Sequence, residues 1–329
     1  MKLSDVRYRV IAFPPSGSGK DISNLLMQAK HEEMDGELAS KFSATMQNVK
    51  FDTWAHHFVK INNKLLIQAN TGNGWKEVYR GTVFKYSTHT SDDKTVSFTA
   101  YDDLYYLQMS SDHLLFSKGE TGASSIRRLV RDWSIPIKTI DGPNVQLAKK
   151  VYRGIKLGQV IQDRLSDSEK MGGGKFVIRS DQGKLCCIQA GANTTVYEFT
   201  ESTPVSSDDE YSIENIVTRV KIYGNEDEGG RAPIEATRDG KTEYGIFQDI
   251  IYSSSFDSLS EARKAAAEII KHDGGMQRSP RINVPNVPWV RKGDRVVIKI
   301  GTISGEFIVE SIVRNIIDLT MSLRVRRSS

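Results

Sequence analysis

The sequence predicts a β-dominated α+β fold, in which two small β-barrel domains are joined by an α+β block. Three observations lead to this fold class. Residues 285–326 read as a tight turn followed by three strands, each apolar on one face and polar on the other. Residues 65–101 contain strands of the same kind. Between these regions, residues 123–171 change to the period of amphipathic helices.

The composition is that of an ordinary globular protein. The chain has 329 residues, of which 38% are hydrophobic and 26% are charged, and this length accommodates two or three domains with their own cores. No apolar run approaches the roughly 20 residues that a membrane span requires. Residues 1–7 contain no apolar segment, so we expect no signal peptide. The net charge of +4 is too small to indicate nucleic-acid binding.

The first β-barrel domain is predicted over residues 1–110. Its clearest strands are residues 65–69, 79–86 and 95–101, and a polar turn at 91–94 separates the last two. In the last strand Val96, Phe98 and Ala100 share one face, because successive side chains of a strand point to opposite sides. One face of this strand is therefore expected to meet a core.

The α+β block is predicted over residues 111–195. Amphipathic helices are expected at residues 123–133 and 157–171, where apolar side chains recur at helical spacing. Three glycines at 172–174 end the second helix. Residues 176–179 and 184–188 follow as a hairpin.

The second β-barrel domain is predicted over residues 196–329 and includes a helix at 259–272. Ser258 and Glu261 form a capping box at the start of this helix. The rest is read as a loop at 202–210, a strand at 216–223, a hairpin turn at Asp239-Gly240, a strand at 244–252 and the final meander.

Charge is distributed unevenly along this last domain. Residues 201–228 hold eight acids and two bases, whereas residues 291–329 hold eight bases and four acids. Two readings stay open, namely two solvated faces, or a sign-matched contact between copies or with a partner. On the second reading the candidate assembly residues are Glu226, Asp227, Glu228, Arg324 and Arg326.

No catalytic, cofactor-binding or metal-binding residue is predicted. The cysteines are the adjacent pair Cys186 and Cys187, and adjacent cysteines rarely bridge. Residues 14–21 resemble a phosphate-binding loop, but Pro14 and Asp21 stand where a glycine and a hydroxyl are needed. The histidine pair at 56–57 is read as part of a strand, where neighbouring side chains diverge and cannot share one metal without a bend in the chain. His31, His113 and His272 are expected at the surface.

Several motifs, in order along the chain, resemble those of phage tail hub proteins. They are Arg80–Val83 with the Thr99–Leu107 corner, Thr218–Gly224, Tyr244–Gln248, the helix at 259–272, and Gly293–Val296 with Gly305–Val309. The chain is identified as similar to the hubs of PBSX-type prophage tails (the XkdQ/YqbQ group), which are related to late-control-D-like contractile-tail hubs. The resemblance covers roughly residues 20–327. The histidine that this family usually carries after its penultimate strand is Arg314 here, which puts any role of that position in doubt.

The resemblance implies a non-enzymatic baseplate hub of a contractile phage tail or of a phage-tail-like bacteriocin. Such a protein is made in the bacterial cytoplasm, forms a homotrimeric ring whose barrel domains build a tube, and becomes part of the particle. Its implied partners are the tail-tube initiator or tube protein, the trimeric spike, a LysM-containing tail protein and baseplate wedge proteins. No cofactor, nucleic acid or membrane insertion is implied. The alternatives are a cell-wall-degrading tail enzyme and a carbohydrate- or receptor-binding tail module.

Overall fold

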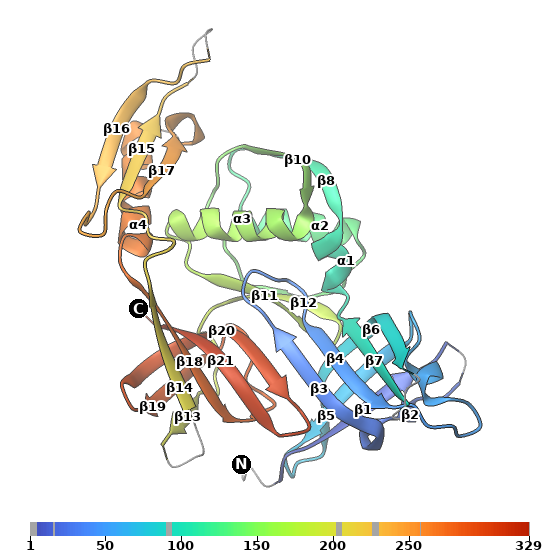
Figure 1. The fold of residues 1–329 in the computed structure, drawn as a ribbon. Coiled ribbons are helices and arrows are strands. Elements are labelled where there is room, and N and C mark those ends of the chain that lie inside the picture. The colour runs from blue at the N-terminus through green and yellow to red at the C-terminus, as the bar shows by residue number, and fades with distance from the viewer. Residues whose placement is uncertain are drawn as a thin grey trace.

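The protein is built mainly of strands, as expected from the sequence. The computed structural model describes residues 5–15, 17–89, 94–201, 206–225, 230–256 and 258–328. In Figure 1 a large sheet region lies below, a helical block lies above its centre, and an arm with its own small sheet extends to the upper left. The β-dominated fold with few helices is therefore confirmed.

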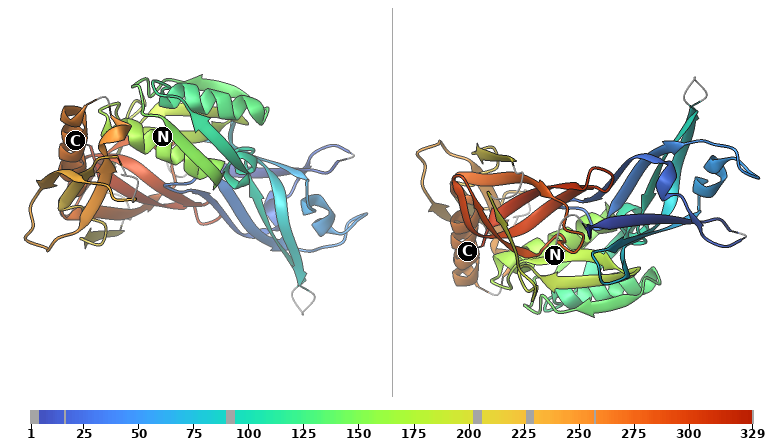
Figure 2. Two further views of the ribbon diagram at one scale, coloured as in Figure 1. Left: turned by 90° about the horizontal axis from the view of Figure 1, so that it is seen from above. Right: turned by 90° about the horizontal axis from the view of Figure 1, so that it is seen from below.

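The large sheet contains strands from both ends of the chain. From the N-terminal end come β1 (Arg7–Phe13), β2 (Lys20–Asp21), β3 (Leu26–Glu33), β4 (Lys41–Gln47), β5 (Lys64–Asn70), β6 (Trp75–His89) and β7 (Thr95–Tyr101). From the C-terminal end come β13 (Tyr197–Thr200), β14 (Ser206–Ser212), β18 (Gln277–Pro285), β19 (Arg295–Ile300), β20 (Ile303–Asn315) and β21 (Thr320–Arg327). The strand order is β14-β18-β21-β20-β3-β4-β7-β6-β5-β1-β2, with β19 beside β20 and β13 beside β19. Figure 2 shows the two ends of the chain as two β regions that meet along this sheet.

The strand pairings differ from the expected pair of closed barrels. Among the described residues the sheet has free ends at β14 and β2, and the two β regions are continuous with each other. The two β regions are continuous because β20 is long, with 13 residues. It pairs with β19 and β21, and its last residues, Ile312–Asn315, also pair with Lys30–Glu33 of β3. A period of two shows which face a residue occupies, but it does not show which strand lies alongside.

Each β region buries one face in its own core. In the N-terminal region Phe42, Ala44 and Met46 alternate with exposed or half-buried residues along β4. The C-terminal core is lined in the same way by residues of β18 to β21. Strands 65–69, 79–86 and 95–101 and the final three-stranded meander were therefore predicted correctly. Residues 206–210, which were read as loop, are instead part of β14, held by seven pairs to β18; residues 202–205 lie outside the described residues.

The helical block packs its helices over small sheets. Its elements are α1 (Leu104–Met109), β8 (Ser111–Phe116), α2 (Gly122–Asp132), β9 (Ile137–Ile140), β10 (Lys150–Lys156), α3 (Leu157–Lys170), β11 (Phe176–Asp181) and β12 (Lys184–Gln189). Both predicted helices and the β11–β12 hairpin are present. The Thr121 side chain caps α2, and Ile126, Leu129 and Val160 are fully buried between the helices. Leu38 from the N-terminal region enters the same core, so the block is anchored to the large sheet.

The arm has a separate core between one helix and three strands. Its elements are β15 (Arg219–Tyr223), β16 (Ile234–Asp239), β17 (Gln248–Tyr252) and α4 (Leu259–Asp273). The helix predicted at 259–272 is present, and Ser258 accepts a hydrogen bond from the Glu261 N–H. The hairpin predicted at Asp239-Gly240 is wrong, because β16 and β17 lie on opposite sides of β15. Gly240 instead allows close packing against α4, because a Cβ at this position would lie 2.5 Å from the Ile270 side chain.

A buried charge cluster joins the two β regions and the helical block. We call Glu33, Arg291, Arg314, Lys292 and His31 the junction cluster. Glu33, at the end of β3, is 2% exposed. Its carboxylate lies 2.5 Å from Arg291 Nε and 3.6 Å from Arg314 Nη1. The same carboxylate accepts a hydrogen bond from the Lys292 backbone N–H. Burial alone would raise the Glu33 pKa, but the two guanidinium groups outweigh it and hold the pKa well below its usual range.

The junction cluster also reaches two further segments. Lys292 Nζ donates to the backbone carbonyls of Met34 and Glu37, and Arg291 donates to the Ser180 carbonyl of β11. Arg179, also on β11, forms an ion pair with Asp294 at 2.8 Å. One cluster therefore fixes the end of β3, the turn before β19, and β11 relative to one another.

His31 is a buried member of this cluster, so its expected surface position is wrong. It is 1% exposed, packs edge-on to the Tyr79 ring, and accepts a hydrogen bond at its Nδ1 from Arg314 Nη1 at 3.1 Å. Burial, followed by the charge of Arg314, lowers the His31 pKa from 6.5 to about 3. The imidazole is therefore neutral in the folded protein at neutral pH.

Removing the Glu33 charge should destabilise the fold strongly. In Glu33→Gln two buried cations lose their shared counter-charge, and we expect the free energy of unfolding to fall by about 3–5 kcal/mol. Glu32→Gln is the matched control, because this neighbour lies on the other face of β3 in a half-exposed pair with Lys41 and should cost less than about 1 kcal/mol. Urea denaturation measures both values, and equal losses would contradict a central role of Glu33.

His31 should make the stability of the protein fall on mild acidification. Below about pH 6.5 His31 is protonated in the unfolded chain but stays neutral in the folded protein. The free energy of unfolding therefore falls by about 1.4 kcal/mol per pH unit as the pH drops from 6.5 toward the folded pKa. His31→Gln removes this contribution and keeps an acceptor for Arg314. Urea denaturation at several pH values should show the difference between wild type and variant shrinking by about 2–3 kcal/mol from pH 7 to 4.5. If the free energies of unfolding of wild type and variant changed in parallel with pH, His31 would not be the group responsible.

Candidate assembly surfaces

The two cysteines are buried in the helical block. Cys186 and Cys187 are free thiols on β12, and Cys187 Sγ donates to the Gly142 carbonyl at 3.1 Å. Burial raises the pKa of Cys187 to about 12, so this thiol remains protonated at neutral pH. The same geometry suits a packed core residue and not an activated nucleophile.

The histidine pair was placed on the wrong element. His56 and His57 lie in a short 3₁₀ helix, Ala55–Val59, and not in a strand, and their rings are edge-on with centroids 4.4 Å apart. His57 Nδ1 is 2.7 Å from the Thr53 hydroxyl. Across the described part of the chain no three His, Cys, Asp or Glu side chains are grouped as metal ligands. His113 and His272 are exposed, as expected.

The stretch that resembles a phosphate-binding loop connects β1 to the short strand β2. A phosphate-binding loop leads into a helix, whereas here the chain continues into β2 and a single 3₁₀ turn, Ser23–Leu25. The Asp21 carboxylate accepts hydrogen bonds from the Ser23 N–H and hydroxyl. Ser16 lies outside the described residues.

The two candidate assembly arginines share one face of β21 and are paired within the chain. Arg324 Nη2 lies 3.0 Å from Asp35, and Arg324 and Arg326 lie 3.7 and 3.4 Å from the two oxygens of Glu310. Lys175 also approaches Glu310, at 3.4 Å. Three cations thus converge on one carboxylate in a polar groove that continues to α3 and α4. About two fifths of each arginine side chain is exposed, so both can still meet a partner.

Of the predicted acidic partners, Glu226, Asp227 and Glu228 lie outside the described residues. Other acids of the same stretch make contacts within the chain. Asp209 on β14 forms a two-pronged ion pair with Arg278 on β18, and Glu201 accepts a hydrogen bond from the Gly301 N–H. Neither contact involves a basic side chain of residues 291–329, so the sign-matched contact that the sequence suggested stays a prediction.

Several strand edges and apolar side chains are available to partners. Among the described strands β14, β16 and β17 each pair on one side only. On the β8–β10 ribbon Leu115 and Val151 are directly paired, and each is 53% exposed. No helix of the described regions is both long and apolar enough to cross a bilayer. Open edges and exposed apolar pairs of this kind are surfaces through which proteins associate.

Comparison with known proteins gives one consistent result. A family model described as YQBQ-like matches residues 37–326. The PBSX phage-like element protein XkdQ of Bacillus subtilis is 25% identical over 241 residues, which cover 68% of this chain and 69% of that protein. The uncharacterized protein YqbQ of the same organism is 24% identical, with the same coverage.

Solved structures extend the similarity to the whole chain. A tail protein of Neisseria meningitidis has a TM-score of 0.69 at 14% identity, covering 98% of this chain and 97% of its own. The 43 kDa tail protein of prophage MuSo2 of Shewanella oneidensis has a TM-score of 0.65 at 13% identity, with 97% and 98% covered. The fold is thus one found in phage tail proteins, and the match over residues 37–326 shows that the chain belongs to the YQBQ-like family.

Proposed function

We propose that this protein is a structural hub in the baseplate of a contractile phage tail or a phage-tail-like bacteriocin. The observation that carries the proposal is the similarity in fold to phage tail proteins over nearly the entire chain, together with family membership. A protein of Escherichia coli described as a type VI secretion component similar to bacteriophage T4 tail proteins gp27 and gp5 also matches, with a TM-score of 0.58 over 92% of this chain.

The finer arrangement is a ring of three copies between the tail tube and the central spike. Each copy contributes two β regions, so a ring of three copies would present six similar β regions to a hexameric tube. The same ring has threefold symmetry, which matches a trimeric spike. The free sheet edges at β14 and β2 support this, because closing a ring lets edge strands pair with a neighbour and removes exposed backbone donors and acceptors. In this arrangement each β region would complete a tube-forming barrel in the particle. The tube initiator, spike, wedge proteins and a LysM-containing tail protein are the proposed neighbours.

The proposal assigns a mechanical role without catalysis. The junction cluster supports it, because a part that joins two symmetries must keep its β regions at a fixed angle under load. The buried thiol of Cys187 also fits a protein that acts through its surfaces.

Localising the chain in purified particles tests the proposal. A particle-producing strain should lose complete tails when the gene is deleted, and a tagged copy should restore them. Electron microscopy with a label against the tag should show one site between the tube and the spike. Label along the sheath or on fibres would contradict the hub role, and clearing of cell walls by the purified chain would contradict the absence of catalysis.

Charge reversal on β21 should weaken assembly in a salt-dependent way. We expect Arg324→Glu with Arg326→Glu to lower the oligomer mass formed with tail partners, most strongly at low salt where exposed charges act over the longest range. Light scattering measures the mass, and thermal melting identifies any loss of folding that follows from breaking the pairs with Glu310 and Asp35. Arg327→Glu, on the next residue and the opposite face, is the matched control for Arg326→Glu alone, because both single variants change the net charge equally. Unchanged mass in the folded double variant would exclude these arginines from the interface.

A further inference from the structure

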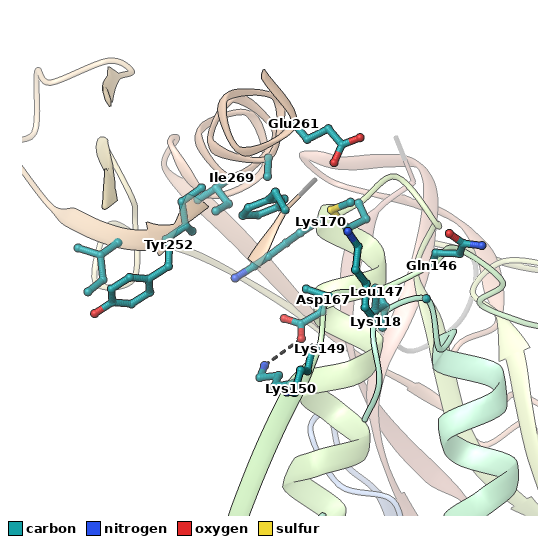
Figure 3. A pocket seen from close by; sticks show the side chains of 17 residues that line it. Lys118, Gln146, Leu147, Lys149, Lys150, Asp167, Lys170, Tyr252, Glu261 and Ile269 are labelled. Atoms are coloured by element: carbon teal, nitrogen blue, oxygen red, sulfur yellow. Dashed lines mark hydrogen bonds and ion pairs between the residues drawn. The ribbon is translucent and has the colours of Figure 1, made fainter. Parts of the chain in front are cut away.

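A groove lies between the arm and the helical block (Figure 3). We call it the arm groove. Its volume is about 340 Å³. One wall is formed by β17 and α4, and the other by residues 146–150 and the end of α3. Leu147, Phe256 and Ile269 provide apolar surface within it.

The groove runs along the open edge of β17. Three consecutive residues of this strand, Ile250, Ile251 and Tyr252, line the groove. Because successive side chains of a strand point to opposite faces, three in a row line one groove only if it meets the strand edge-on. Among the described strands β17 pairs with β15 alone. The Ile250 N–H donates to the Asp249 carboxylate at 2.8 Å, as expected for an edge donor with no adjoining strand.

The opposite wall is positively charged. The groove lining as a whole contains four lysines against one aspartate and one glutamate, a net charge of +2, and the glutamate lies on α4, on the other wall. Lys150 is paired with Asp167 at 2.8 Å. Lys149 and Lys170 have no ion-pair partner among the residues that the structure describes, and they stand opposite Tyr252 and Ile269 (Figure 3). An occupant with carboxylates would compensate these two charges.

We propose that the arm groove binds an extended segment of a partner protein that alternates acidic and apolar residues and adds as a strand to the edge of β17. Backbone hydrogen bonds to the strand edge would give affinity, and alternate side chains would sort between the apolar surface and the lysines. The occupant is a different protein and not a second copy. The acidic strand of this chain, β14, is held by its seven pairs to β18 and by the Asp209–Arg278 ion pair, so it is already committed.

This inference rests on the proposed function in one respect, namely that the partner belongs to the same particle. The groove assignment and the hub role can be disproved independently of each other. If the chain assembles into tails but the groove binds no strand, the groove assignment alone is wrong. If the groove binds and the chain is absent from particles, the hub role is wrong.

Fluorescence anisotropy with the full-length chain tests the proposal. The probe is a short labelled peptide that alternates glutamate and valine. We expect saturable binding that weakens at high salt, and a dissociation constant raised about tenfold or more by Lys149→Glu with Lys170→Glu. The same peptide N-methylated on alternate residues, which cannot complete strand hydrogen bonds, should bind no better than buffer controls.

The matched control variant is Lys60→Glu with Lys184→Glu, two exposed lysines outside the groove, which changes the net charge equally. Equal weakening in this control would reduce the binding to general charge attraction and overturn the proposal. Equal binding of the N-methylated peptide would overturn strand addition, and no binding by the natively folded chain would overturn the site. Self-association of the chain that the groove substitutions abolish would assign the groove to a second copy instead.

Discussion

The architecture depends on one buried carboxylate. Glu33 sits where β3 ends, and it compensates two arginines that arrive from the C-terminal region almost the whole length of the chain away. A buried ion pair is costly to form, because both groups must leave water, so its stabilising effect depends on complete pairing. Here backbone carbonyls and the Asp294–Arg179 pair supply further partners, but the pairing is incomplete, because Arg314 Nε and Nη2 are buried without a hydrogen-bond partner among the described residues. The outcome is geometric specificity, because hydrophobic contacts alone would tolerate sliding of one β region on the other.

The surfaces left over by this arrangement explain how such a chain can serve as an assembly part. Its β regions have filled cores, but the sheet they form keeps free ends, and the arm carries a further open edge beside a lysine-rich wall. The junction cluster fixes the two β regions relative to each other and to β11, whereas the arm lies outside this cluster and has its own core. A rigid body with unpaired edges is suited to association.

The sequence could predict the elements but not their partners. Helices 123–133, 157–171 and 259–272 and the final strands were readable because each buries one face, and burial imposes a period. Strand β14 was missed because its residues are acidic and mostly exposed, so it is specified by pairing with β18 and not by a core. The sequence alone does not distinguish Glu32 from Glu33. Glu33 becomes part of the buried cluster only because the fold brings Arg291 and Arg314 to it. His31 was misplaced for the same reason, since its acidic neighbours suggested solvent.

The shared strand β20 has a consequence for biosynthesis. Its pairing with β3 joins residues separated by 279 to 285 positions, as in the Arg314–His31 contact. The N-terminal β region emerges from the ribosome long before residues 303–315 exist, so throughout translation it carries a bare β3 edge and an uncompensated Glu33. Contacts of such long sequence separation form late and slowly. Synthesis of β20 is therefore the step that covers the β3 edge, and a product that terminates before residue 303 would leave this edge exposed to aggregation and proteolysis.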